Sequence, residues 1–241
     1  MKNKIYRSLL IFLVFAMGKS IFADAKPLPK FDAGTINWGT QRYKFTLIKK
    51  DEKIELGSVT LRNKLTQNRV ILTDEYLLRI EGKPMSLNMT QICLKDPYLS
   101  PVKIECKGKG NEEFRTFKAT IKDGQAEISG PRNGFMKIPK GTVTSVAFMR
   151  IVTQLPRVIG ATYRYAFGLE ASEMNLKKDY LIKVIGKETI DSNGPVKCWK
   201  ISQNGDGIRE QLFWVTEEGI LQRILMDGRK QIDLQTGEPG D

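Results

Sequence analysis

The chain contains no histidine, the residue most often used for proton transfer near neutral pH. A Ser-His-Asp triad, a Cys-His dyad and a zinc site that includes histidine are therefore excluded. Chemistry based on paired carboxylates or on a Ser-Lys dyad remains open. One S-x-x-K pattern runs from Ser100 to Lys103, but it contains Pro101 and begins a predicted strand. Such a dyad needs a helix to bring both side chains onto one face, so we expect no catalysis there.

Acidic residues occur throughout the chain, but no spacing marks two of them as facing each other at the roughly 5 to 9 Å that glycoside hydrolysis needs. The segment Asn204 to Gly207 suggests a calcium loop. It lacks the alternating carboxylates and the distal glutamate of such a loop, so a hairpin turn is the simpler interpretation. The sequence therefore predicts a protein that is not an enzyme and that has neither a metal nor another cofactor.

Three cysteines, Cys93, Cys106 and Cys198, allow one disulfide and one free thiol. We expect the disulfide between Cys93 and Cys106, because these residues flank the turn-rich segment from Lys95 to Ser100 almost symmetrically. Closing a loop of this size contributes about 3 kcal/mol. The alternative is three buried, reduced thiols, because free cysteine packs like a small apolar residue.

The first 25 residues have the layout of a secretory leader. Lys2, Lys4 and Arg7 precede an apolar stretch from Ser8 to Gly18, and the segment Ala23 to Ala25 supplies small residues for cleavage. The apolar stretch is too short to span a bilayer, and no later stretch approaches the roughly 18 apolar residues of a membrane span. We expect residues 1–25 to be a signal peptide and residues 26–241 to form one exported, soluble domain, periplasmic or extracellular.

The chain is basic, with 39 Lys and Arg against 27 Asp and Glu and a net charge of +12. Such a charge raises encounter rates with anionic partners or keeps the protein soluble. The basic pairs fall where we place turns and strand ends, which indicates solvated hairpin tips rather than one binding stripe. Arg42 to Phe45 alternates basic and aromatic residues, as an amphipathic strand does, so no specific nucleic-acid partner is expected.

Apolar residues recur at every second position in short runs, separated by Gly, Asn, Asp or Pro, which is typical of half-buried antiparallel strands. Seven such strands are predicted before a helix and six after it. The first seven are Tyr43–Leu47, Ile54–Leu61, Val70–Leu78, Leu87–Cys93, Val102–Cys106, Phe117–Ile121 and Ala126–Ile128. The last six are Thr162–Phe167, Tyr180–Glu188, Val196–Gln203, Ile208–Val215, Ile220–Asp227 and Gln231–Leu234.

A single helix is predicted after a loop from Gly130 to Gly141. Thr142 can cap it, and Pro156 ends it after Leu155. The helix is apolar over most of its circumference, so it should be buried against the sheet. It either completes the core as a plug or covers an apolar groove as a lid.

The strands Ile208–Val215 and Ile220–Asp227 are partly apolar on both faces. In the first of them, Trp214 shares one face with Leu212, while Phe213 and Val215 lie on the other. A strand of this kind has both sides covered, whether by its own chain, by a partner or by a ligand. With one helix for about a dozen strands, some apolar surface is left for long loops or for another molecule.

Several of these segments resemble a family of exported bacterial proteins of unknown function. They are Leu155–Gly160, Val184–Ile190, Cys198–Ile201 and Phe213–Ile224, together with Leu99–Val102 and the opening Tyr43 strand with Gly57 in its partner. Members of the family look related to the lipoprotein-carrier fold. The resemblance implies a mainly β protein with a single, strongly curved antiparallel sheet, a half-barrel with one short helix on its concave side. It also implies an envelope protein whose groove accepts acyl chains.

The leading hypothesis is a non-catalytic envelope protein that binds a lipid or another amphipathic ligand in a groove under the helix. Phe148, Met149, Trp199 and Trp214 are the candidate lining residues, because aromatic and methionine side chains suit an adaptable apolar pocket. The alternative is a β module that docks an envelope protein or an anionic polymer through a sheet face or edge. A carboxylate-based enzyme acting on glycans is the third possibility.

Overall fold

The structure, a computed structural model, describes residues 25–36, 39–50, 52–110, 116–130, 133–192, 194–205 and 208–235. Apart from Ala25, the predicted leader lies outside these residues. The strands before the helix are β1 (Lys26–Pro27), β2 (Gly39–Lys49), β3 (Glu52–Leu65), β4 (Val70–Ile80), β5 (Lys83–Cys93), β6 (Pro101–Lys109), β7 (Phe117–Lys122), β8 (Gln125–Ser129), β9 (Gly134–Lys137) and β10 (Val143–Thr144). After it come β11 (Thr162–Glu170), β12 (Asn175–Asp191), β13 (Pro195–Gly205), β14 (Ile208–Val215), β15 (Leu221–Met226) and β16 (Lys230–Leu234).

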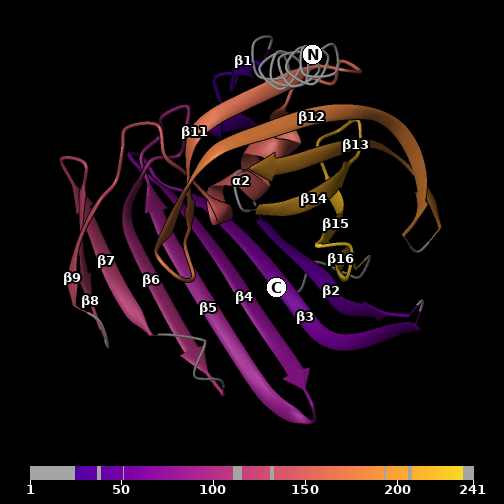
Figure 1. Cartoon of the computed structure of the whole chain (residues 1–241), viewed down its shortest axis with the longest axis horizontal. Coiled ribbons are helices and arrows are strands. Elements are labelled where there is room, and N and C mark those ends of the chain that lie inside the picture. The colour runs from indigo at the N-terminus through magenta and orange to yellow at the C-terminus, as the bar shows by residue number, and fades with distance from the viewer. Residues whose placement is uncertain are drawn as a thin grey trace, which may run out of the picture.

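These strands form one 16-stranded sheet, in which all pairings are antiparallel except those of β1 and β10 with β11 (Figure 1). The order along the sheet is β1, then β11 to β16, then β2 to β9, so the pairing of β16 with β2 joins the two parts of the chain. The prediction of a mainly β chain with a single sheet and one short helix is confirmed.

The sheet stays open, and it is neither closed into a barrel nor strongly curled. Its end strands, β1 and β9, are only two and four residues long, and no pairing in the described part of the chain joins them. Closure requires the two end strands to pair, and such short strands offer few hydrogen bonds for it. The strong curvature implied by the resemblance is not found either.

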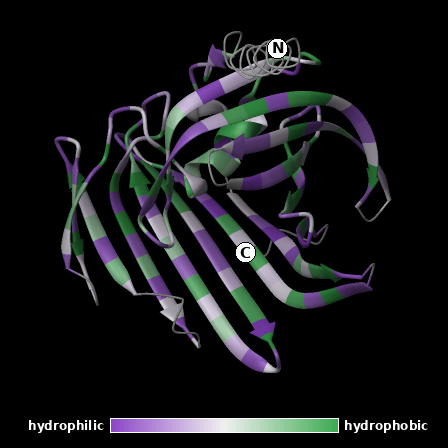
Figure 2. Cartoon of the chain, in the orientation of Figure 1, coloured by the Kyte–Doolittle hydropathy of each residue, from purple (hydrophilic) through white to green (hydrophobic). Residues whose placement is uncertain are grey.

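Alternation of apolar and polar residues builds the strands, as the bands of colour along them in Figure 2 show. Six of the seven hairpin strands predicted before the helix lie within β2 to β7, and the seventh within β8. The turns follow the predicted chemistry, because Asp123 and Gly124 have φ of 51° and 76°, and Asp227 and Gly228 have 56° and 64°. The segment predicted as a loop from Gly130 to Gly141 contains β9, which pairs with β8.

The helix is shorter than predicted. It consists of α2 (Ser145–Ile151) followed by the 3₁₀ turn η2 (Val152–Gln154), and a second 3₁₀ turn, η1 (Ala33–Thr35), precedes β2. Thr144 rather than Thr142 caps α2, accepting a hydrogen bond from the backbone N–H of Ala147 (3.0 Å). Val143 and Thr144 are drawn out of the helix because they pair with β11. The helix is buried, and it contacts β4 and β11.

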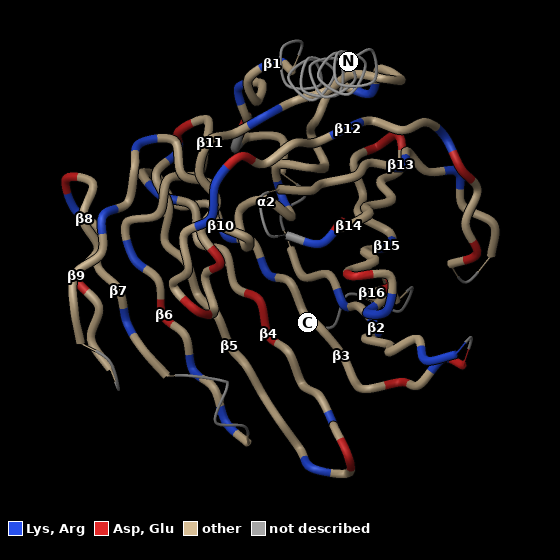
Figure 3. The backbone as a smooth tube through the Cα atoms, in the orientation of Figure 1, with Lys and Arg blue, Asp and Glu red and all other residues tan. Residues whose placement is uncertain are grey.

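Charged residues of both signs are interspersed along the strands and at the hairpin ends (Figure 3). Exposed pairs such as Arg62 with Glu75 (2.9 Å) and Lys200 with Glu188 (2.9 Å) join neighbouring strands. Pairs at this level of exposure contribute little to stability, about 0–1 kcal/mol each. The described residues therefore carry their excess positive charge without one continuous basic stripe along the strands.

The predicted disulfide between Cys93 and Cys106 is wrong, because all three cysteines are free and buried. Cys106 lies opposite Met89 on β5, while Cys93 lies opposite Pro101 after a register shift in the β5–β6 pair. Met89 and Cys93 are four residues apart on one strand, a separation of roughly 13 Å at the usual rise per residue. Because Cys106 lies beside Met89, the Cα atoms of Cys93 and Cys106 are about this far apart, which is too far for a disulfide.

We expect all three thiols to resist alkylation in the folded protein and to react fully after unfolding without a reductant. Burial raises the pKa of Cys93 to about 12 and those of Cys106 and Cys198 to about 11, so the reactive thiolate is scarce in the native state. Mass spectrometry of labelled protein counts the modified residues. A single labelled thiol in the unfolded, unreduced protein would contradict this assignment.

Candidate functional site

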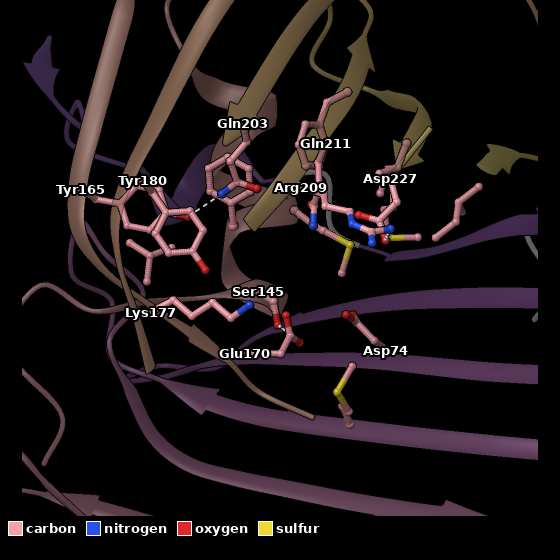
Figure 4. Close-up of a pocket in the computed structure, with 18 of the residues that line it drawn as sticks. Asp74, Ser145, Tyr165, Glu170, Lys177, Tyr180, Gln203, Arg209, Gln211 and Asp227 are labelled. Carbon is pink, nitrogen blue, oxygen red and sulfur yellow. Dashed lines mark hydrogen bonds and ion pairs between the residues drawn. The ribbon is translucent and has the colours of Figure 1, made fainter. Parts of the chain in front are cut away.

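A cavity of about 380 Å³ lies beside α2 and is bounded by strands from both parts of the sheet (Figure 4). Its volume falls within the range of about 300–1,000 Å³ that is usual for small-molecule sites. One part of its wall is apolar and another is polar. The lining residues are Asp74, Tyr76, Met89, Val143, Ser145, Phe148, Met149, Tyr165, Glu170, Lys177, Tyr180, Gln203, Arg209, Gln211, Phe213, Ile224, Met226, Asp227 and Ile232.

The apolar wall combines methionine and aromatic side chains. Met89 comes from β5, Met149 from α2 and Met226 from β15, so three separate elements each place a thioether in the cavity. Phe148 packs edge to face against Phe213 of β14, with 5.4 Å between the ring centroids. Flexible thioethers beside fixed aromatic rings give a wall that adapts to the shape of an apolar guest.

The polar wall is built where β11 meets the start of α2. Ser145 donates a hydrogen bond to Glu170 (2.9 Å), and Ser172 donates a second one (3.3 Å). Burial raises the pKa of Glu170 above its ordinary value, although these hydrogen bonds oppose the shift. Lys177 of β12 points its ammonium group toward Ser145 and Glu170 in Figure 4. A polar group of a guest would meet both donors and acceptors here.

Two tyrosines on neighbouring strands form a stacked pair at one end of the cavity. The rings of Tyr165 and Tyr180 have centroids 4.5 Å apart and planes inclined by 9°. Gln203 of β13 donates its side-chain N–H to the Tyr165 hydroxyl, and Phe148 stacks on the same ring at 5.8 Å. Burial raises the pKa of Tyr180 to about 12, so both hydroxyls stay neutral at physiological pH.

A buried ion pair holds α2 against β4 beside the cavity. The Arg150 guanidinium lies 2.8 Å from the Asp74 carboxylate, and both side chains are almost fully excluded from solvent. Arg150 also donates to the side chain of Asn63 (2.8 Å) and to the carbonyl of Val146 (3.0 Å). Burial raises the pKa of Asp74, and Arg150 opposes the shift. Asp74 is therefore bound to a counter-ion rather than free for proton transfer.

The sequence-predicted site residues fall in two different places. Phe148 and Met149 line the cavity, whereas Trp199 and Trp214 do not. Trp199 lies in the main core and donates its indole N–H to Glu217 (2.8 Å). Trp214 belongs to a separate small cluster with Ile190 and Cys198. The four residues proposed as one lining therefore do not meet.

The cavity also contains residues that sequence reasoning missed, above all Tyr165, Glu170, Lys177 and Tyr180. The predicted strand Thr162–Phe167 places Tyr163 and Tyr165 on the same face. This pair of aromatic residues is the sequence signal that could have indicated Tyr165 as a lining residue. The partners on β12 follow only from the register, in which Tyr165 lies opposite Tyr180 and Gly168 opposite Lys177. Three acidic residues, Asp74, Glu170 and Asp227, also line this cavity, although no spacing in the sequence relates them.

Other kinds of site find no support in the described residues. No group of three or more Cys, Asp and Glu side chains there is arranged as metal ligands. Within the same part of the chain, none of the helices has the length and apolar character to cross a membrane. Comparison with known proteins gives no match to a family model, to a curated protein or to a solved structure.

Proposed function

We propose that this protein is a non-catalytic, exported binding protein of the cell envelope, and that the cavity beside α2 holds a lipid-like, amphipathic molecule. The observation that carries the proposal is the two-sided wall of the cavity. Met89, Met149 and Phe213 offer an apolar surface, and Glu170 and Lys177 offer polar groups in the same cavity. An amphipathic molecule satisfies both walls at once, whereas a purely apolar guest would desolvate the polar one.

The position of the helix supports the proposal. In this sheet, β12 to β16, β2 and β3 lie between β11 and β4, yet α2 contacts both of these strands. The helix therefore bridges distant parts of the sheet beside the cavity, and its position helps to bound the space that the guest would occupy. The leader-like residues 1–25 support export.

Binding is favoured over carboxylate-based catalysis by the state of the carboxylates. Asp74 faces the Arg150 guanidinium at 2.8 Å, and Asp227 lies 3.9 Å from Arg209. Glu170 accepts two hydrogen bonds from serine hydroxyls. Each carboxylate thus has a cation or a hydroxyl donor beside it, whereas a catalytic pair would need two carboxylates that face a common substrate.

We expect the Met149→Asp variant to bind a single-chain amphiphile at least about tenfold more weakly than the wild type. Met149 is half-buried on α2 and lines the cavity, so a carboxylate there places an unpaired charge against the apolar guest. Titration of a fluorescent fatty acid into the mature protein measures the affinity. The Phe135→Asp variant is the control, because Phe135 is 71% exposed on β9, does not line the cavity and receives the same charge.

Native mass spectrometry with lipid extraction, on protein purified from its own host without detergent, tests the proposal independently. A discrete extracted lipid supports the assignment. If the protein carries no lipid and Met149→Asp binds the fatty acid as well as the wild type does, the cavity is not the binding site. Docking of a partner would then be the better hypothesis, at the exposed side chains of Val158 and Ile159.

A further inference from the structure

A second cavity of about 760 Å³ lies at the free edge of β11, under the short strand β1. The parallel partner β1 covers β11 only at Tyr163 and Arg164, and β10 covers it only at Gly168 and Leu169. The segment 165–167 between them has no strand partner on this edge within the described residues. The cavity lies beside this segment. Leu28, Tyr98 and Ala166 line it together with polar residues.

Two residues belong to the walls of both cavities, and they are the stacked pair Tyr165 and Tyr180. Their parallel rings, 4.5 Å apart, stand between the cavity beside α2 and the cavity under β1. We name these two spaces the inner cavity and the edge cavity. No other described residue lines both cavities. The shared wall therefore contains two side chains, and a side chain can change its rotamer while the backbone of the sheet stays in place.

The two tyrosines are held to different degrees. Tyr165 accepts a hydrogen bond from Gln203 and stacks on Phe148, so both its hydroxyl and its ring are fixed. In the described part of the chain, no side chain or backbone group hydrogen-bonds to the Tyr180 hydroxyl. The Tyr180 ring lies over Gly168, where an added Cβ would be 2.1 Å from a ring carbon. Only glycine at position 168 leaves room for the ring in this position.

We infer that the inner and edge cavities form one site for a long acyl chain, with the Tyr180 ring as a movable partition between them. This inference rests on the proposed function and adds to it the kind of ligand. A short chain fills the inner cavity alone, whereas a long chain displaces the Tyr180 ring toward solvent and continues along the uncovered edge of β11. The ligand class is thus a long-chain fatty acid or a lipid that presents one such chain.

The first test uses calorimetry to measure the affinities of caprylate, laurate and palmitate for the wild type and four variants of the mature protein. We expect Tyr180→Ala, which removes the partition, to bind palmitate about tenfold more tightly relative to caprylate than the wild type does. Gly168→Ala should shift the ratio in the same direction, because its Cβ displaces the ring. Tyr180→Phe keeps the ring and should keep the wild-type ratio. Gly186→Ala is the control, since an added Cβ there meets nothing within 4 Å.

The second test locates the end of the chain and separates a partition from a cavity that is merely enlarged. A palmitate analogue with a photoreactive group at its methyl end should label peptides that contain Leu28 or Tyr98 in the wild type. A caprylate analogue should label Met89 or Met149 instead. Palmitate labelling confined to the inner cavity, with an unchanged chain-length ratio in Tyr180→Ala, would overturn the inference while leaving the proposed function intact. Absence of binding by every acid to every form would overturn both.

Discussion

The Arg150→Met variant is expected to have a free energy of unfolding about 3–5 kcal/mol lower than the wild type, because it leaves the Asp74 carboxylate buried without its counter-ion. The pair joins α2 to β4, so its loss also loosens the helix that lines the inner cavity. For a domain of this size, about 2–4 °C is lost per kcal/mol, and the melting temperature should fall by about 10 °C. Differential scanning calorimetry measures the change.

The pH dependence of this penalty identifies its cause. Burial raises the pKa of Asp74 in the folded protein, and Arg150 opposes that rise. A carboxyl group whose folded pKa lies above its unfolded value costs stability as the pH rises above the unfolded pKa, and the cost disappears on acidification. Removing Arg150 raises the folded pKa further, so the difference between variant and wild type should shrink as the pH falls from 7 toward about 4. A penalty that does not change with pH would point to lost packing instead.

Two further variants complete the test. In the double variant Arg150→Met and Asp74→Leu, both charges are gone and most of the stability should return, as apolar replacements of buried ion pairs commonly allow. Arg62→Met removes an exposed pair between neighbouring strands, Arg62 with Glu75 at 2.9 Å, and should cost no more than about 1 kcal/mol. An equal loss in Arg62→Met and Arg150→Met would contradict the importance of burial.

Local signals explain why most strands could be predicted from the sequence. The dipeptides Asp123-Gly124 and Asp227-Gly228 adopt the positive φ that tight hairpins need, and residue types alone reveal that requirement. The strand edges follow from alternation over a few residues. The start of the helix did not follow in the same way, since Thr144 is preferred over Thr142 only because β11 pairs with Val143 and Thr144.

The candidate site was harder to predict because it depends on register. Trp199 lies opposite Val215, and Lys200 lies opposite Trp214, so the two tryptophans on neighbouring strands point to opposite faces of the sheet. A shift of one residue would have placed them together. The ion pair joins Asp74 to Arg150, which is far away in the chain. The stacking of Tyr165 on Tyr180 depends on the register of β11 with β12. No local pattern contains that information.

Gly57→Ala is the second variant for which we expect a large loss of stability. Gly57 has φ of 142°, a conformation almost restricted to glycine, and an added Cβ would lie 2.0 Å from the backbone oxygen of Leu77 on β4. That oxygen belongs to a paired strand and cannot move away without breaking the ladder between β3 and β4. Backbone strain of about 1–3 kcal/mol adds to an overpacking cost of similar size. Urea unfolding should show the sum as a lower midpoint.

Gly39→Ala separates the two contributions in the same sheet. Gly39 has nearly the same backbone conformation, with φ of 140°, but an added Cβ there meets nothing within 4 Å. This variant should therefore lose only the backbone term, about 1–3 kcal/mol. The difference between Gly57→Ala and Gly39→Ala then measures the close approach of β3 to β4 at Leu77. Equal losses in the two variants would show that the contact of the added Cβ with the Leu77 oxygen relaxes without cost. The strands β3 and β4 would then be less tightly constrained than their close approach at Gly57 indicates.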